Sequence, residues 1–159
     1  MCFSATASFS VSAVLLGGGI YTTVRSAKYD RSMLLFAAYP LAFGIQQAME
    51  GFVWLRLEAQ ATSNNAALGF LFFSHFFWLA WVPLSAWWLE TMRGTPGRSQ
   101  ILAAFALTGL LAGILLYVPL WQHTLFAPQV EAGNICYNTT VVFDAIFPEF
   151  VTRIIYAAI

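Results

Sequence analysis

The sequence predicts an all-α, polytopic transmembrane helix bundle, and two observations carry that prediction. Of the 159 residues, 60% are hydrophobic and only 9% are charged, whereas a soluble domain has roughly 45–50% apolar and 25% charged residues. So few charges cannot cover the surface of a water-soluble domain, and the apolar surplus is therefore expected to face lipid. The second observation is that the apolar residues gather in stretches of about 17–25 residues, the length that a helix needs to cross the hydrocarbon core.

Four of these stretches are expected to be full transmembrane helices in a single domain that covers 1–159. They run at about 8–24, 33–57, 66–89 and 101–121. A backbone in lipid has to satisfy its own hydrogen bonds, which favours helices over open strands. Pro40 in the second stretch and Pro83 in the third are candidate kink positions, because proline lacks the amide proton that the helix uses.

A fifth apolar stretch occupies about 150–159 and is too short to cross a bilayer. We interpret it as the start of a fifth helix, and the chain as a fragment of a longer protein of about seven helices. A re-entrant or interfacial C-terminus is the alternative. The preceding region, about 122–148, contains Pro128, Gly133 and Pro148 and is predicted to be a long extramembrane loop.

The distribution of Lys and Arg predicts the orientation, because cytoplasmic loops carry an excess of both. Five cations lie in the first and third linkers and two on the opposite side: Arg25, Lys28, Arg31, Arg93 and Arg98 against Arg56 and Arg153. We therefore expect a multi-pass protein of the cell inner (plasma) membrane, with its N-terminus outside and the lipid bilayer as its partner. The formal net charge is zero and no basic block occurs, which argues against a nucleic-acid partner.

The two cysteines, Cys2 and Cys136, both fall on the predicted outer side. In a bacterium that side is oxidising. Cys2 and Cys136 are therefore candidates for a disulfide that ties the N-terminus to the long loop. Two unrelated cysteines are the alternative reading.

Polar side chains inside the apolar stretches are the candidate site residues. Each ionisable group at a helix centre costs roughly 2.5–3.5 kcal/mol on insertion, so it needs a partner or a purpose. The second stretch contains Gln46, Gln47 and Glu50, whose spacings of three and four residues put them on one helical face. The third stretch contains Ser74 and His75.

The predicted helix ends place Glu50 about 10 Å and His75 about 13 Å below the outer boundary at 1.5 Å per residue. Consecutive helices joined by a short loop usually pack side by side, so these two side chains are expected to meet. Glu50 and His75 are then candidate catalytic or metal-ligating residues, with Gln46, Gln47 and Ser74 as candidate substrate-binding neighbours. Zinc is the metal this pair suggests, although one carboxylate and one imidazole make an incomplete zinc site.

Three segments carry a resemblance to a known family. They are Met1-Cys2-Phe3-Ser4-Ala5, Phe43-Gly44-Ile45-Gln46-Gln47 and Glu50-Gly51-x-Val53-Trp54-Leu55. Together they resemble a family of uncharacterised bacterial multi-pass membrane proteins that begin Met-Cys-x-Ser-Ala, have about seven helices and contain a domain of unknown function. The resemblance covers roughly the first 90 residues. It implies that Cys2, Ser4, Gln47, Glu50 and His75 belong to the family's recurrent pattern, and it implies no activity.

A looser analogy points to the seven-helix membrane hydrolases of the alkaline ceramidase and adiponectin-receptor type, which hold zinc with Ser, His and Asp from their helices. Here Ser74 and His75 are adjacent, so the Ser-x-x-x-His spacing of those enzymes is missing. Three functions stay open. The protein is a membrane-embedded metal-dependent hydrolase, a small-solute or proton-linked transporter, or a non-catalytic subunit of a membrane complex or homo-oligomer whose polar stripe joins helices.

Overall fold

The computed structural model describes residues 4–60, 65–94, 96–122, 128–131 and 133–137, together with Thr139, Pro148 and Val151. Within these residues the chain forms four helical rods and one β-hairpin. The rods are α1 (Ala5–Tyr29); a 3-10 turn (Arg31–Met33) followed by α2 (Leu34–Ala37) and α3 (Tyr39–Glu58); α4 (Asn65–Phe72), a π-helical turn (Phe73–Phe77) and α5 (Trp78–Arg93); and α6 (Pro96–Gln122).

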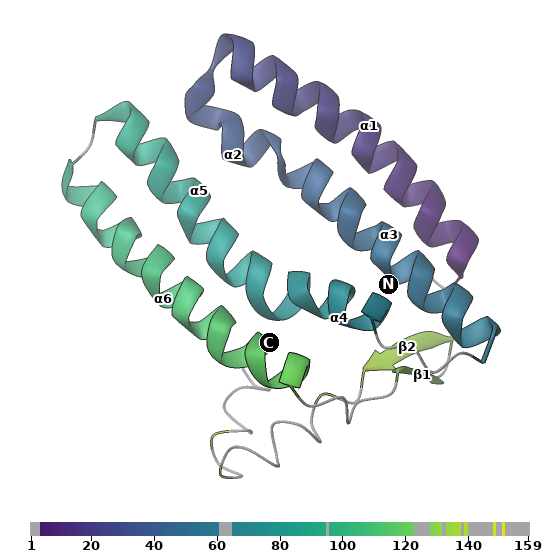
Figure 1. The fold of residues 1–159 in the computed structure, drawn as a ribbon. Helices are drawn as coiled ribbons and strands as arrows, with labels where there is room; N and C mark the ends of the chain where they lie inside the picture. The colour runs from purple at the N-terminus through teal and green to yellow at the C-terminus, as the bar shows by residue number, and fades with distance from the viewer. Residues whose placement is uncertain are drawn as a thin grey trace.

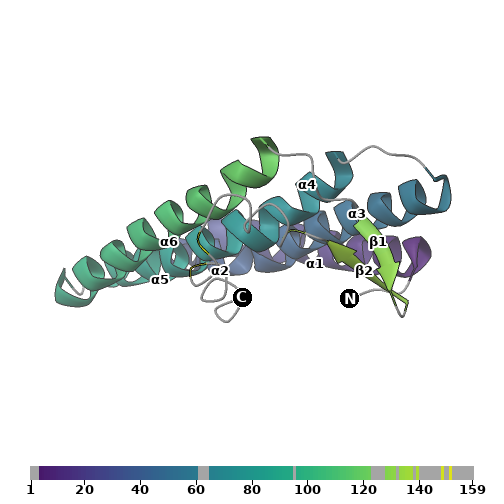
Figure 2. The same ribbon diagram turned by 90° about the horizontal axis from the view of Figure 1, so that it is seen from below.

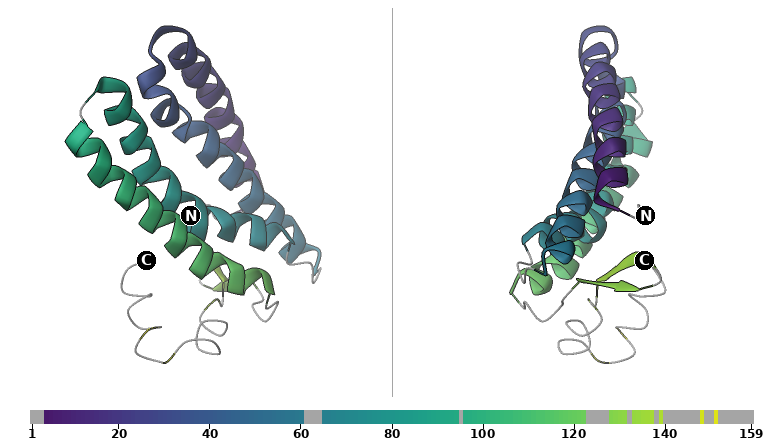
Figure 3. Two further views of the ribbon diagram at one scale, coloured as in Figure 1. Left: turned by 60° about the vertical axis from the view of Figure 1, so that its left-hand side comes forward. Right: turned by 90° about the vertical axis from the view of Figure 1, so that its right-hand side faces the viewer.

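The four rods lie side by side in one layer, in the order α1, α3, α5, α6 (Figure 1). Seen along its edge the layer is thin, and seen from below it is long and slightly bent (Figures 2 and 3). Successive rods run in opposite directions. The start of α1, the end of α3, the start of α4 and the end of α6 therefore share one end of the layer, and the two turns before α2 and α6 share the other (Figure 1).

Three helices of the described chain are long and apolar enough to cross a membrane: Ala5–Tyr29, Asn65–Arg93 and Gly97–Gln122. They leave large apolar side chains uncovered, and Val14, for example, is 75% exposed. A surface of this kind is stable against lipid chains and unfavourable against water. The fold class predicted from composition is thus confirmed at this level.

The first rod extends beyond the predicted 8–24 at both ends. Its N-cap is Ser4, whose hydroxyl accepts a hydrogen bond from the Ala7 amide at 3.2 Å, and the helix runs on to Tyr29 through the polar turn that contains Lys28. Hydropathy identifies only the lipid-compatible part of a helix. Capping and backbone hydrogen bonds decide where it begins and ends.

The second rod is interrupted beside Pro40, one of the two candidate kink positions in the sequence. α2 ends at Ala37 and α3 starts at Tyr39, with Pro40 in its first turn. Proline is favourable in a first turn and unfavourable in a helix interior, which explains the break beside it. Pro83, by contrast, lies inside α5, which continues through it, and the irregular part of the third rod is the π-helical turn about two to three turns earlier.

Small residues bring the rods together in pairs. A side chain at Gly19 would meet the Leu41 backbone of α3, and one at Gly109 would meet the Leu79 carbonyl of α5. Gly109 and Gly113 form a Gly-x-x-x-Gly pair on α6, the pattern that lets membrane helices approach closely. The layer therefore consists of two close helical hairpins, α1–α3 and α5–α6.

Long polar and aromatic side chains connect the two hairpins across their seam, the line where α2 and α3 face α5. The Tyr39 hydroxyl lies 2.9 Å from Ser85 Oγ. The Trp81 indole donates to the Leu35 carbonyl at 3.3 Å. Contacts of this length join helices whose backbones stay apart, so the seam is more open than either hairpin.

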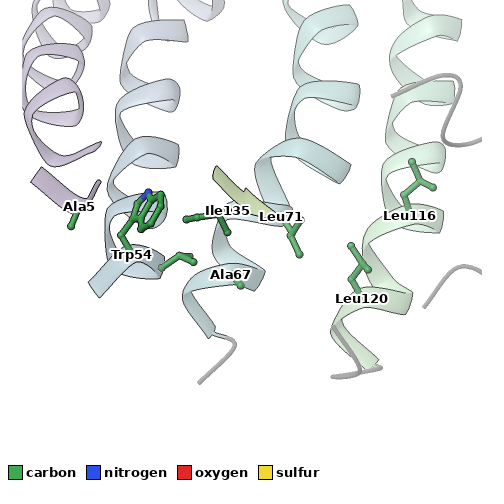
Figure 4. Close-up of a cluster of buried hydrophobic side chains, with 8 residues drawn as sticks. Ala5, Trp54, Ala67, Leu71, Leu116, Leu120 and Ile135 are labelled. Atoms are coloured by element: carbon green, nitrogen blue, oxygen red, sulfur yellow. The ribbon is translucent and has the colours of Figure 1, made fainter. Parts of the chain in front are cut away.

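The predicted long loop at about 122–148 contains a β-hairpin, an element that the sequence analysis did not anticipate. β1 (Pro128–Glu131) pairs antiparallel with β2 (Asn134–Tyr137), with Val130 opposite Ile135. Ile135 packs into the buried cluster at this end of the layer, among Trp54, Ala67 and Leu71 (Figure 4). Of the predicted fifth helix at about 150–159, only Val151 lies within the described residues, and that prediction stays open.

Candidate functional site

The buried face of α3 carries the polar stripe that the spacing predicts. Gln46 is 8% exposed and Glu50, one turn on, is 1% exposed, while Gln47 is half-buried. Glu50 is thus one of the most deeply buried side chains of an apolar layer. Removing a carboxylate from water to this position costs free energy, so its presence indicates either a functional site or a polar link between helices.

His75 lies in the π-helical turn of the third rod and is 7% exposed. Its Nδ1 lies 2.8 Å from the Ser74 hydroxyl, and that hydroxyl donates to the Leu71 carbonyl at 3.2 Å. A serine hydroxyl has one proton. When that proton points to Leu71, Nδ1 must be the donor to Ser74, and Nε2 then presents its lone pair to the surroundings.

The π-helical turn is the local feature that hydropathy alone does not reveal. It consists of Phe73-Ser74-His75-Phe76-Phe77, and the Trp78 amide after it donates to the Phe73 carbonyl, five residues back. One extra residue in a helical turn rotates the side chains that follow, and such turns are frequent at functional sites. Here the turn holds Ser74 and His75, the two candidate site residues of the third rod.

A hydrogen bond sets the register between α3 and the third rod. The Trp78 indole donates to Gln46 Oε1 at 2.8 Å. The two rods are antiparallel, so one turn from Gln46 leads to Glu50 and one turn from Trp78 leads in the same direction to Ser74 and His75. The register thus places Glu50 and His75 at one level of the layer.

Tyr137 is a site residue that the sequence analysis missed. It lies in β2, outside the spans, and its ring stacks on Phe70 with the centroids 5.0 Å apart. Burial raises the pKa of its hydroxyl, and the negative charge of Glu50 raises it further. The phenol therefore stays protonated beside the carboxylate. The sequence contained one signal for this residue. Ile135 and Tyr137 are two positions apart, a spacing that is typical of the buried face of a strand.

Ser8 is a second residue that the analysis missed. It is 0% exposed in the interface between α1 and α3, and its hydroxyl makes no hydrogen bond to any residue that the structure describes. Next to it, the Phe9 ring covers Gly51, one residue from Glu50. Ser4, Ser8 and Ser12 recur every four residues, and this spacing could have identified a polar face on the first helix.

The site therefore combines a carboxylate, an imidazole and a phenol, all three largely removed from the surface. Such groups bind, hold and pass protons. As metal ligands, Glu50 and His75 have no third His, Cys, Asp or Glu beside them in the described part of the chain. Cys2 lies outside the described residues, so its bridge to Cys136 in β2 stays a prediction.

Comparison of the chain with protein families, with curated proteins and with solved structures finds no match.

Proposed function

We propose that this is an integral membrane protein that exchanges protons at Glu50 and carries them across the membrane, as a proton-linked transporter does. The observation that carries the proposal is the burial of Glu50, at 1% exposure, together with His75 in an apolar helical layer. A carboxylate in lipid-like surroundings changes its charge when its surroundings change, which is how proton-linked membrane proteins use such a group.

The surroundings of Glu50 support this use. His75 supplies an imidazole, a group that can accept and donate a proton, and the negative charge of Glu50 helps to keep the Tyr137 phenol protonated by raising its pKa. The seam between the helical hairpins gives the layer a place to open without breaking either close helix pair. Kinked or irregular helices around a buried polar site are typical of transporters, and this layer has a break at Ala38 and a π-helical turn at Phe73–Phe77.

The other two functions receive less support. A metal-dependent hydrolase needs three or four protein ligands, and the described residues bring two together. A purely structural pair would use the polar groups to join helices, a role worth roughly 0.6 kcal/mol per hydrogen bond. Ser12, Gln46 and Tyr39 already make such links with neutral groups, so a carboxylate is not needed for that purpose.

The deciding experiment compares wild type with Glu50→Gln in proteoliposomes that enclose a pH-sensitive dye. We expect an imposed pH gradient to drive proton entry through wild type. We expect Glu50→Gln to reduce that entry to the level of protein-free liposomes. Glutamine keeps the size and polarity of the side chain and cannot exchange a proton at neutral pH.

Thermal unfolding of the same two proteins supplies the control. A proton-exchange role predicts that Glu50→Gln unfolds within a few degrees of wild type or above it, because the desolvation cost of a buried charge is removed. A variant that conducts protons like wild type would overturn the proposal. So would a wild type that conducts none, and a stability loss in Glu50→Gln without any flux in wild type would favour the structural role.

A further inference from the structure

The end of the layer opposite the Glu50 site carries an excess of positive charge. Five cations and two carboxylates lie there, which leaves three net positive charges: Arg25, Lys28, Arg31, Arg93 and Arg98 with Asp30 and Glu90. We call these seven residues the basic end. All five cationic side chains are exposed, so their charges face the surroundings. The described residues at the other end, Arg56, Glu58 and Glu131, sum to one negative charge.

Both helical hairpins contribute to the basic end, and contacts across the seam hold them together there. The Trp88 indole of α5 donates to the Arg31 carbonyl at 3.0 Å. Asp30 accepts hydrogen bonds from the Ser32 hydroxyl and amide, at 2.6 and 3.0 Å. These bonds hold the pKa of the Asp30 carboxyl below its usual value, and Arg93 from the other hairpin contributes. Arg31 and Arg93 thus lie on the two sides of one polar junction.

Aromatic side chains mark this end as a membrane boundary. Arg25 and Lys28 lie over the Tyr29 ring, at 4.3 and 5.3 Å from its centroid, and Trp88 is partly exposed beside Arg31. Trp and Tyr collect at the level of the lipid headgroups, and Arg and Lys reach from there to the phosphates. The cations therefore stand where lipid phosphates would meet them.

Below the basic end the seam contains an apolar hollow of about 210 Å³. Six of its lining residues come evenly from the two hairpins: Ala38, Ala42 and Ile45 from the first, and Phe73, Phe77 and Trp81 from the second. A hollow without polar groups suits a hydrocarbon chain and gives a free phosphate ion nothing to bind. The headgroup of a lipid would thus bind the basic end, and its acyl chain would fill the apolar hollow in the same seam.

We infer that the basic end binds the phosphate of an anionic lipid, whose acyl chain occupies the apolar hollow in the seam. This inference is independent of the proton-exchange role of Glu50. A lipid bound there would bridge the two hairpins where their backbones are farthest from close packing. Each basic residue near an anionic surface contributes roughly a fivefold gain in affinity, and guanidinium groups bind phosphates through paired hydrogen bonds.

Quenching of tryptophan fluorescence by brominated lipids tests the site on the intact protein. Trp81 lines the hollow and Trp88 lies at the basic end, so a brominated lipid bound there quenches both. We expect brominated phosphatidylglycerol to quench more strongly than brominated phosphatidylcholine in the same nanodiscs. We expect the double variant Arg93→Gln/Arg98→Gln to weaken that preference about 25-fold, and Arg56→Gln, at the other end, to leave it unchanged.

Three results would overturn the inference. The first is equal quenching by the two lipids, and the second is an effect of Arg56→Gln as large as that of the double variant. The third is full displacement of phosphatidylglycerol by inorganic phosphate at constant ionic strength, which would assign the basic end to a free anion. Should the double variant fail to fold, wild type alone decides. The preference of wild type for phosphatidylglycerol over phosphatidylcholine must fall as salt is raised from about 0.1 M to 1 M, because the electrostatic screening length drops from about 10 to 3 Å over that range.

Discussion

Tyr137 is the residue of the β-hairpin that the charge of the buried Glu50 carboxylate influences. Its ring is held by stacking on Phe70, and its hydroxyl lies in the field of Glu50. That hydroxyl has no hydrogen-bond partner among the residues that the structure describes. The packing of the ring and the chemistry of the hydroxyl are therefore separable, and two substitutions can distinguish them.

Tyr137→Phe should keep the stability of wild type or raise it slightly, because it removes a buried polar atom and leaves the stacked ring in place. Tyr137→Ala should lower the free energy of unfolding by about 3 kcal/mol, because it also removes the ring. Thermal or denaturant unfolding in one detergent measures both. A stability loss in Tyr137→Phe as large as that in Tyr137→Ala would mean that the hydroxyl carries the stabilisation.

At the scale of the element, α6 owes its position to two glycines rather than to its hydropathy. Gly109 faces the Leu79 carbonyl, and Gly113 faces Phe76 at 2.9–3.1 Å from where its Cβ would lie. The Phe76 contacts include backbone atoms, which cannot rotate out of the way as a side-chain end can. The helix pair α5–α6 therefore depends on the absence of side chains at these two positions.

Gly109→Ala should destabilise the protein by about 1–3 kcal/mol, the usual cost of forcing extra volume into a packed interior. Gly17→Ala is the matched control. It makes the same change inside another membrane-length helix, at a position with no neighbouring atom within 4 Å of the new Cβ. It should be neutral or stabilising, because alanine favours the helix. Equal effects of the two substitutions, measured by thermal unfolding, would contradict close packing at Gly109.

At the scale of the whole molecule, four antiparallel rods place the two kinds of polar segment at opposite ends. The β-hairpin and the end of α3 lie at one end, and the turns before α2 and α6 lie at the other (Figure 1). Three of the rods are long and apolar enough to cross a membrane. The rod that contains α3 is the polar exception, and it is placed between two apolar neighbours in the middle of the layer. This arrangement shields Glu50 from lipid as well as from water.

Cysteine labelling in whole cells tests that arrangement. In a background with Cys2 and Cys136 replaced by serine, Gln100→Cys and Gln129→Cys introduce thiols at exposed positions near opposite ends. We expect a membrane-impermeant maleimide to label Gln129→Cys in intact cells and Gln100→Cys only after lysis. The reverse pattern would contradict the orientation drawn from the Lys and Arg distribution. Labelling of both in intact cells would contradict the single crossing, by α6, between them.

The sequence determined the apolar helices, the polar stripe of α3 and the candidate pair. Length and hydropathy are properties of a local stretch, and the three- and four-residue spacing of Gln46, Gln47 and Glu50 fixes their common face in any helix. Pro40 likewise marked the place where the second rod is interrupted. The rise per residue of a helix was enough to predict that Glu50 and His75 lie at similar depths.

Only the tertiary structure decided what surrounds that pair. The π-helical turn at His75, the β-hairpin that brings Tyr137 to Glu50, and the single-layer order of the rods all depend on contacts between distant segments. Hydropathy cannot rank such contacts, because lipid and a neighbouring helix are about equally favourable surroundings for an apolar face. The close approach of α6 to α5 rests on two missing side chains, and it becomes visible only when the partner backbone is in place.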